Sequence, residues 1–320
     1  MSGLTAQAAA LPPAAARRPE TALHRAGRLA LFALAVVGGL AGIGEIWLHV
    51  TSDPVGDAHA YFAAATRLNA GLPLYPAAAD PSTNTIYLYP PLLAIALRPL
   101  ALLPFPIFAA AWEAIVLGSF VLLIVQLGAG PRTWLAIGIL GIPIGWALAI
   151  GQAHVPLTLL LAIGQPWSIA LAANVKVFPA LVILWWIGRR EWQAFGAFLG
   201  WMLVFGLIQL LLDWNATWAF LRGGVGLAQL GDVHNISPYV FISPQVWVVL
   251  LIAGCLATLA LAKTRFGWPV AVALGTLSPP RLLVYMLTGL LAAIREPRQA
   301  GATDPSALPD VATAYARAVR

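Results

Sequence analysis

The chain has 320 residues, of which 60% are hydrophobic and only 9% charged, and its mean hydropathy is +0.84. Soluble domains carry roughly 25% charged residues, so this composition excludes a water-soluble globular enzyme and indicates a polytopic membrane protein. The net charge of +6 is interpreted as a topology signal in loops and tails rather than as a nucleic-acid surface. With Cys255 as its one cysteine, the chain forms no intrachain disulfide.

The N-terminal residues 1–28 are rich in Ala and Pro and end in a basic cluster of arginines. The apolar run that follows, residues 29–50, matches the ~20 residues that cross the hydrocarbon core of a bilayer. A basic stretch before an apolar one also fits a cleaved signal peptide, but the length of the run favours an uncleaved anchor. Positive charge marks the cytoplasmic side, so we expect a disordered cytoplasmic tail over 1–28 and an extracytoplasmic residue 51.

Further apolar segments follow, and Pro or Gly marks most of the junctions between them. They read as 90–103, 106–127, 133–150, 152–164, 166–187, 192–212, 244–262, 267–277 and 281–294. Several are shorter than a full span, so they must tilt, re-enter or join across kinks. We therefore predict an all-α transmembrane bundle of about 8–10 membrane segments over residues 29–295. The polar residues 296–320 are predicted to form a second cytoplasmic tail.

This topology assigns the loops to the two sides of the membrane. The basic loops at 189–190, 263–265 and 295–298 all fall on the cytoplasmic side, as the positive-inside tendency requires, and Arg67, Arg132 and Arg222 are left in outside loops. Two long segments, 51–89 and 213–243, then lie outside the cytoplasm. The first is amphipathic and aromatic, so we expect it to carry interfacial helices.

Asp57 is the first candidate for chemistry. It follows the first predicted span, within the stretch Asp-Pro-Val-Gly-Asp-Ala-His of residues 53–59. A carboxylate at the boundary between membrane and water can act as a general base on a lipid-borne substrate and still exchange protons with solvent. The alternative is that Asp57 caps an interfacial helix, which is a common use of Asp.

Charged residues inside apolar segments are the second clue, because each costs at least ~2.5 kcal/mol unless it is compensated. They are Glu45, Arg98, Glu113 and Lys176. Arg98 and Glu113 lie at similar depths on neighbouring segments, so we expect them to form an ion pair. Lys176 has no such neighbour in sequence. A cation that faces a cavity suits an anionic group such as phosphate, and a pair with Glu45 is the alternative.

Two polar stretches interrupt the apolar pattern. One is Gly-Gln-Ala-His, in which Gln152 and His154 either line a cavity or satisfy freed backbone groups. The other contains Asp232 and His234, which repeat the Asp-x-His spacing of the first outside segment; this spacing is not diagnostic of a metal site. The sequence has no Walker-type loop, no HExxH helix and no GxSxG elbow.

The order of several motifs resembles one enzyme family. After the Asp of the first outside segment come GLPLY and YLYPPLLAIALRPLALLP, and then GQAH, NVKVFPALVIL, HNIS and LSPPRLLVY. Together they cover most of residues 50–290 and resemble glycosyltransferase family 87, whose members are membrane enzymes of the GT-C fold that use polyprenyl-phosphate sugars. The family usually has Gly-Gln-x-Asn where this chain has GQAH.

The resemblance implies an inverting sugar transfer with Asp57 as the catalytic base. Lys176 and Arg281 then bind the donor phosphate, acting electrostatically on the leaving group. The residues expected to bind the sugar or the acceptor are Tyr61, Tyr87, Gln152, His154, His234 and Asn235. The two tyrosines are expected to line the sugar pocket by stacking.

The same resemblance implies the substrates and the place of the reaction. The donor is a lipid-linked hexose, with mannose first, and the acceptor is a hydroxyl of a lipid or a glycan. A donor of this type has no nucleotide diphosphate that must be held, so a metal is not required. We expect no cofactor and no nucleic-acid partner. The expected location is the plasma membrane, with the N-terminus cytoplasmic and the active site extracytoplasmic. The alternative is a secondary transporter or flippase for a lipid-linked or anionic substrate, with ionisable residues along a path near the midplane.

Overall fold

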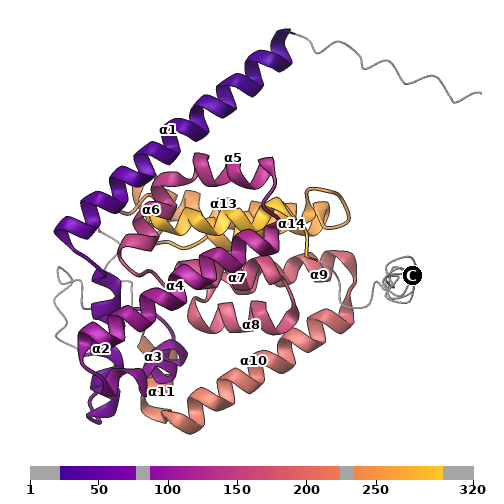
Figure 1. Ribbon diagram of the computed structural model, residues 1–320. Helices are drawn as coiled ribbons and strands as arrows, with labels where there is room; N and C mark the ends of the chain where they lie inside the picture. The colour runs from indigo at the N-terminus through magenta and orange to yellow at the C-terminus, as the bar shows by residue number, and fades with distance from the viewer. Residues whose placement is uncertain (1–21, 77–86, 224–233, 298–320) are drawn as a thin grey trace, which may run out of the picture.

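The computed structural model describes residues 22–76, 87–223 and 234–297, and the regular elements of this part are helices (Figure 1). Strand-like pairing among the described residues is limited to an isolated antiparallel bridge between Asn235 and Leu283. The all-α class predicted from the sequence is therefore confirmed. Most of the two predicted tails lies outside the described residues.

The elements are α-helices and short 3-10 helices, the latter labelled η. In chain order they are α1 (Ala22–Ser52), α2 (Gly56–Asn69), α3 (Pro91–Leu97), η1 (Leu100–Leu102), α4 (Phe105–Leu127), α5 (Pro131–Ile139), α6 (Gly141–Ala149), α7 (His154–Ile163), α8 (Pro166–Val175), η2 (Phe178–Val182), α9 (Ile183–Arg189), α10 (Trp192–Leu212), α11 (Trp214–Gly223), α12 (Pro238–Phe241), α13 (Pro244–Leu261), α14 (Gly267–Leu277) and η4 (Val284–Ile294).

Among the described residues, α1, α4, α10 and α13 are long and apolar enough to cross a bilayer. The predicted segment 133–150 is broken, because α5 and α6 meet at 74° and form at most one bent span. Other apolar helices are shorter: the ten residues of α7 reach about 15 Å, half of the ~30 Å hydrocarbon core. The described part of the chain thus has four or five candidate membrane spans accompanied by shorter apolar helices, as in a multi-pass membrane protein.

Prolines account for many of the interruptions. They occupy the first two positions of α3, α4, α5, α8, α12 and α13. Proline lacks an N–H group, which the first turn of a helix does not need, and its ring disfavours continuation of a preceding helix. Each of these prolines therefore marks the start of a helix.

Glycines allow α1 to lie close along α5 and α6 (Figure 1). A Cβ atom on Gly42 would overlap the backbone of Gly141, and a Cβ atom on Gly138 would lie 2.6 Å from the carbonyl oxygen of Ala35. Small residues are a usual means of close helix approach in membranes. Because α1 begins at Ala22, the last arginines of the predicted N-terminal tail lie on its first turns.

The two predicted extracytoplasmic segments meet at one end of the molecule, where α2, α3 and α11 lie together (Figure 1). The basic loops assigned to the other side meet at the opposite end. There Arg189 Nη1 lies 3.1 Å from Glu296 Oε1, and Arg295 Nη1 donates to the carbonyl oxygen of Gln126 at 3.1 Å. Arg189 and Arg295, from two of the loops that the positive-inside tendency places in the cytoplasm, therefore lie at one end of the fold. The loop before Arg132, expected outside, lies at this end too, since a Cβ atom on Gly128 would lie 3.9 Å from Arg295 Nη1.

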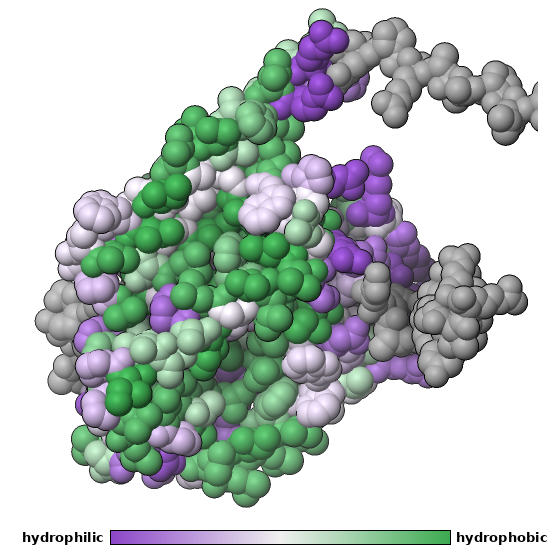
Figure 2. All heavy atoms as spheres, in the orientation of Figure 1, coloured by the Kyte–Doolittle hydropathy of each residue, from purple (hydrophilic) through white to green (hydrophobic). Residues whose placement is uncertain are grey.

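The surface and the interior divide as expected for a protein in lipid. Figure 2 shows apolar residues over most of the visible face, with hydrophilic residues gathered at the free end of α1 and toward α9. Inside, one cluster of buried apolar side chains surrounds Tyr61, Phe108 and Trp112, and a second surrounds Trp185 and Trp268. The first cluster forms the floor of the site described next.

Candidate active site

Asp57 is fixed at the start of α2 by backbone contacts with the end of α6. The N–H of Val55 donates to the carbonyl oxygen of Ala149 at 3.1 Å, and the N–H of Asp57 donates to that of Ile150 at 3.0 Å. Val55 occupies the N-cap position with φ of 49°. This left-handed conformation is rare for a β-branched residue and costs on the order of 1–3 kcal/mol. The surrounding contacts thus hold Asp57 against the turn after α6. Val55 occupies the N-cap position of α2, so Asp57 does not cap the helix.

The turn after α6 depends on Gly151, which has φ of +68°. The indole Nε1 of Trp112 donates to the carbonyl oxygen of Gly151 at 2.6 Å. A Cβ atom on Gly151 would lie 3.2 Å from Glu113 Oε2, so both the backbone conformation and the space favour glycine here. The turn directs the side chain of Gln152 toward α2.

The side-chain amide of Gln152 is fully buried and has one favoured orientation. The hydroxyls of Tyr61 and Tyr89 each donate to Gln152 Oε1 at 2.8 Å, and Gln152 Nε2 donates to Asp57 Oδ2. Reversing the amide would lose the bond to Asp57, because an ionised carboxylate only accepts, whereas the tyrosine hydroxyls can donate or accept. Asp57 Oδ1 makes no hydrogen bond with any described residue, so it is the oxygen that remains to accept a proton.

Lys176 follows the last residue of α8 and is half-buried. Its Nζ lies 3.4 Å from His154 Nδ1, 5.0 Å from the centre of the Tyr89 ring and 5.3 Å from the centre of the Tyr285 ring. Aromatic faces attract a cation without neutralising it. These rings therefore hold the Lys176 side chain in place without neutralising it, while burial lowers its pKa from 10.5 to about 7 and the nearby Asp57 opposes that fall.

The electrostatics of the site centre on Asp57. Burial raises the pKa of its carboxyl from 3.8 to about 6, while attraction by Lys176 and by Arg281 and the hydrogen bond from Gln152 oppose the rise. A general base works best when its pKa lies near the operating pH. Asp57 is therefore ionised at neutral pH and still basic enough to take a proton.

Asn235 places Arg281 at the site. Asn235 is 1% exposed, and its Oδ1 accepts from the backbone N–H groups of Ser237 and Leu282 at 2.9 Å each. Its Nδ2 donates to the carbonyl oxygen of Pro280 at 3.0 Å. These bonds tie the second outside segment to the stretch that carries Arg281. They favour a positioning role for Asn235 over the direct sugar contact expected from the sequence.

Tyr61 and Tyr87 are buried, with exposed fractions of 0% and 4%. The hydroxyl of Tyr87 donates to the carbonyl oxygen of Pro90 at 2.7 Å and accepts from the N–H of Ala94 at 3.1 Å. Tyr87 therefore fixes the start of α3, as Tyr61 fixes the Gln152 amide. Because both rings are enclosed by the core, the structure favours these supporting roles over the stacking on sugar that was expected.

Two tyrosines not selected from the sequence complete the site. Tyr89 binds Gln152 and faces Lys176, and Tyr285 faces Lys176 as well. Both lie inside motifs that carry the family resemblance, YLYPP and LSPPRLLVY. That position was the available signal; the contact with Lys176 is a feature of the tertiary structure.

His234 lies at the exposed rim of the site. Its ring meets Trp146 edge to face at a centroid distance of 6.0 Å, and Trp146 meets Tyr285 in the same way at 5.8 Å. Within the described part of the chain, no group of three or more His, Cys, Asp or Glu side chains could hold a metal ion. Asp232, the partner of His234 in the Asp-x-His pattern, lies outside the described residues.

Two ion pairs considered from the sequence are not formed. Arg98 Nε donates to Asn69 Oδ1 at 3.0 Å, whereas Glu113 Oε2 is buried without a hydrogen-bond partner among the described residues. The predicted Arg98–Glu113 pair is therefore wrong, because α3 ends before Arg98 and the side chain turns back to α2. Glu45 lies 3.5 Å from His49 Nε2 on its own helix, so it does not neutralise Lys176.

An apolar groove of about 200 Å³ borders the site between α3, α4, α7 and α8. The side chains that line it are aliphatic or aromatic. They are Leu92, Leu93, Ala96, Trp112, Ile115, Ala153, Pro156, Leu157, Leu160, Leu171 and Val175. Ala153 and Val175 adjoin Gln152 and Lys176 in sequence, so the groove lies beside the elements that carry these two residues.

The fold and the site define a multi-pass membrane protein in which a half-buried carboxylate, two cations and an apolar groove occupy one place. A family model for glycosyltransferase family 87 matches residues 87–297. The chain belongs to glycosyltransferase family 87 and is a membrane glycosyltransferase, as the motif order indicated. No curated protein and no solved structure matches the chain. The matched residues include Lys176 and Arg281, whereas Asp57 lies before them.

Proposed function

We propose that the protein transfers a hexose, with mannose the first candidate, from a polyprenyl-phosphate donor to a hydroxyl of a lipid or glycan acceptor. The observation that carries the proposal is that Asp57 lies within the electrostatic reach of two cations, Lys176 and Arg281. One oxygen of the Asp57 carboxylate accepts a hydrogen bond from a fixed amide, and Lys176 and Arg281 attract the carboxylate. The site therefore contains a base for the acceptor hydroxyl and cations for the leaving phosphate, as such a transfer requires.

Asp57 is the general base. As the acceptor oxygen attacks the anomeric carbon, its proton passes to Asp57 Oδ1, the new carbon–oxygen bond forms and the bond to the donor phosphate breaks. Attack from the face opposite the phosphate inverts the anomeric centre. A hydroxyl is a weak nucleophile at neutral pH, and positioned proton removal contributes typically 10²- to 10⁴-fold.

Lys176 and Arg281 stabilise the leaving lipid phosphate. Its negative charge grows as the sugar departs, and cations fixed in a site with little water act strongly on developing charge. The aromatic faces of Tyr89 and Tyr285 hold Lys176 without consuming its charge. His234 at the rim is proposed to contact sugar hydroxyls or the acceptor, whereas His154, which is 4% exposed and lies against Lys176 Nζ, is proposed to position Lys176.

The polyprenyl chain of the donor is proposed to lie in the apolar groove. The groove offers aliphatic and aromatic walls next to Gln152 and Lys176, so an isoprenoid tail there would leave its phosphate near the cations. Burial of such a chain contributes about 25 cal/mol per Å² of apolar surface. The groove therefore supplies affinity for the lipid, and the polar groups fix the position of its head.

The reaction is proposed to take place outside the cytoplasm. Arg189 and Arg295 lie at the end opposite α2, α3 and α11, whereas Arg67 and Arg222 lie in the last turns of α2 and α11. Since positive loops stay in the cytoplasm, this arrangement supports a cytoplasmic N-terminus and an extracytoplasmic active site in the plasma membrane.

The test compares Asp57→Asn with wild type for transfer from radiolabelled polyprenyl-phosphate mannose in membranes. Asparagine keeps an oxygen that accepts from Gln152 but cannot take the proton, so the variant should insert and fold while incorporation into a lipid product is lost. Asp53→Asn is the matched control, because Asp53 bonds to His49 at 2.7 Å instead. Retained turnover in Asp57→Asn would remove Asp57 from the mechanism.

A further inference from the structure

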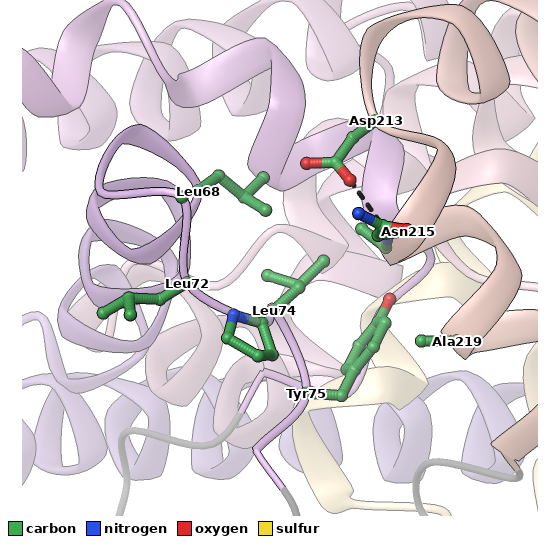
Figure 3. A pocket seen from close by; sticks show the side chains of 10 residues that line it. Leu68, Leu72, Leu74, Tyr75, Asp213, Asn215 and Ala219 are labelled. Atoms are coloured by element: carbon green, nitrogen blue, oxygen red, sulfur yellow. Dashed lines mark hydrogen bonds between the residues drawn. The ribbon is translucent and has the colours of Figure 1, made fainter.

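A second cavity, of about 320 Å³, lies at the far end of α2 from Asp57 (Figure 3). Its walls are the turn after α2, from Gly71 to Tyr75, and the start of α11. The cavity begins at Leu68, and the ~1.5 Å rise per helical residue places it about 17 Å from Asp57. The cavity is therefore separate from the site of proton transfer, although both lie at the same end of the molecule.

Asp213 supplies the charge in this cavity. It follows α10 with φ of −156°, and its Oδ1 accepts from the N–H of Ala216 at 2.9 Å. The other carboxylate oxygen makes no hydrogen bond with any described residue. Figure 3 shows the Asp213 carboxylate and the Tyr75 ring facing the same hollow, with Asn215 beside them. The cavity thus offers one fixed acceptor group and one amide that both donates and accepts.

The remaining walls are mostly apolar. Leu74 is 3% exposed and forms the floor, whereas Leu72 is 50% exposed at the rim. A few polar groups set in apolar surface are the usual form of a small-ligand site. A neutral sugar matches this lining, because its C–H faces pack on leucine and tyrosine while its hydroxyls donate to the carboxylate. A phosphate does not match it, since Asp213 would repel the charge.

The wall of the cavity is connected to the active site by hydrogen bonds. The hydroxyl of Tyr75 donates to the carbonyl oxygen of Tyr89 at 2.7 Å, and the hydroxyl of Tyr89 donates to Gln152 Oε1 at 2.8 Å. Gln152 in turn holds Asp57. A ligand in the cavity is therefore held against the same framework that positions the base.

We propose that this cavity binds a sugar unit of the acceptor, at a distance from the hydroxyl that receives the new sugar. The proposal rests on the sugar transfer proposed above and specifies its acceptor: an oligosaccharide or a glycolipid with several sugar units. A monosaccharide acceptor does not extend from Asp57 to Asp213. The cavity then selects acceptors by length as well as by the hydroxyl that reacts.

The test measures binding without transfer. The full chain, purified in detergent and given no donor, is applied to a panel of neutral oligosaccharides built from mannose, glucose, galactose or arabinose, together with phosphorylated forms. Ala219→Trp fills the cavity from an exposed position of α11, and Asp213→Asn removes the charge but keeps the acceptor for the Ala216 N–H. Ala110→Trp, at an exposed position of α4, is the matched control.

Wild type and Ala110→Trp should bind at least one neutral oligosaccharide. The two cavity variants should bind it at least about tenfold more weakly, which is the loss expected for one hydrogen bond to a charged group. Equal binding by wild type and Ala219→Trp across the panel, or preference for phosphorylated glycans, would overturn the proposal. If wild type transfers sugar while the cavity variants bind normally, only the cavity proposal fails. If glycans bind there but wild type transfers no sugar, the cavity stands as a saccharide site and the proposed transfer fails.

Discussion

Replacing Gln152 by Glu tests the central contact of the site. The substitution is nearly isosteric, and the glutamate oxygen that takes the place of Oε1 still accepts from Tyr61 and Tyr89. The other oxygen replaces the donor Nε2 and faces Asp57 Oδ2. Two carboxylates at hydrogen-bond distance cannot both ionise readily, so the pair should hold one proton between them.

The size of the effect follows from the charges. At ~4 Å and an effective dielectric constant of about 20, the repulsion is about 4 kcal/mol, which corresponds to about 3 pKa units. The pKa of Asp57 is about 6 in the wild type, so the loss of the second proton moves to about pH 9 in the variant. At pH 7 the fully ionised pair is then about 1% populated, and sugar transfer should fall by up to about 100-fold, the full loss applying when Asp57 rather than the introduced glutamate holds the shared proton.

The assay is the pH dependence of transfer from polyprenyl-phosphate mannose in membranes. Gln152→Glu should recover full activity only above about pH 9. Gln152→Met loses the hydrogen bond without adding charge, so it should shift the acid limb to higher pH by about 1–2 units. Gln126→Glu, the same change at the far end of α4, should leave the profile unchanged. A wild-type acid limb in both Gln152→Glu and Gln152→Met would refute the contact between Gln152 and Asp57 or the role of Asp57 as base.

Three other predictions follow from the same contacts. The pKa of Asp57 in the folded state is raised from 3.8 to about 6, so the folded state binds the proton more tightly than the unfolded state and stability should fall as the pH rises through this window. Melting temperatures in detergent should show this slope for wild type and a flatter slope for Asp57→Asn. Equal slopes would contradict the prediction. Gly141→Leu should lower the melting temperature by the equivalent of about 1–3 kcal/mol, because the added side chain forces α1 away. Gly118→Leu should not, because a Cβ atom added at Gly118 has nothing within 4 Å. Equal melting temperatures for the two variants would argue against the close approach of α1. Asn235→Ala should leave two buried backbone N–H groups without acceptors, which costs about 1–3 kcal/mol of stability for each group. Because the change displaces Arg281, it should raise the KM for the donor more than it lowers kcat. An unchanged KM would separate Asn235 from donor binding.

Part of the site could be found from local sequence patterns. Asp57 follows an apolar span and Lys176 interrupts another, and each stands out because a charge in apolar surroundings needs a reason. Gln152 was visible as a polar residue at a Gly-marked break. Tyr89 did not stand out from Tyr87 two positions earlier, since both are tyrosines in one aromatic stretch. Their hydroxyls differ only in what lies opposite them in the fold.

The sequence by itself determined the class of environment, the helical fold and the starts of proline-led helices. These features depend on composition and local pattern, which act within one segment. The tertiary structure decided which side chains meet: Gln152 with Asp57, Asn235 with the stretch before Arg281, and Arg98 with α2 instead of Glu113. Such contacts depend on how each helix is rotated and where it bends relative to segments far away in the chain, and near-uniform apolar helices leave that rotation to packing.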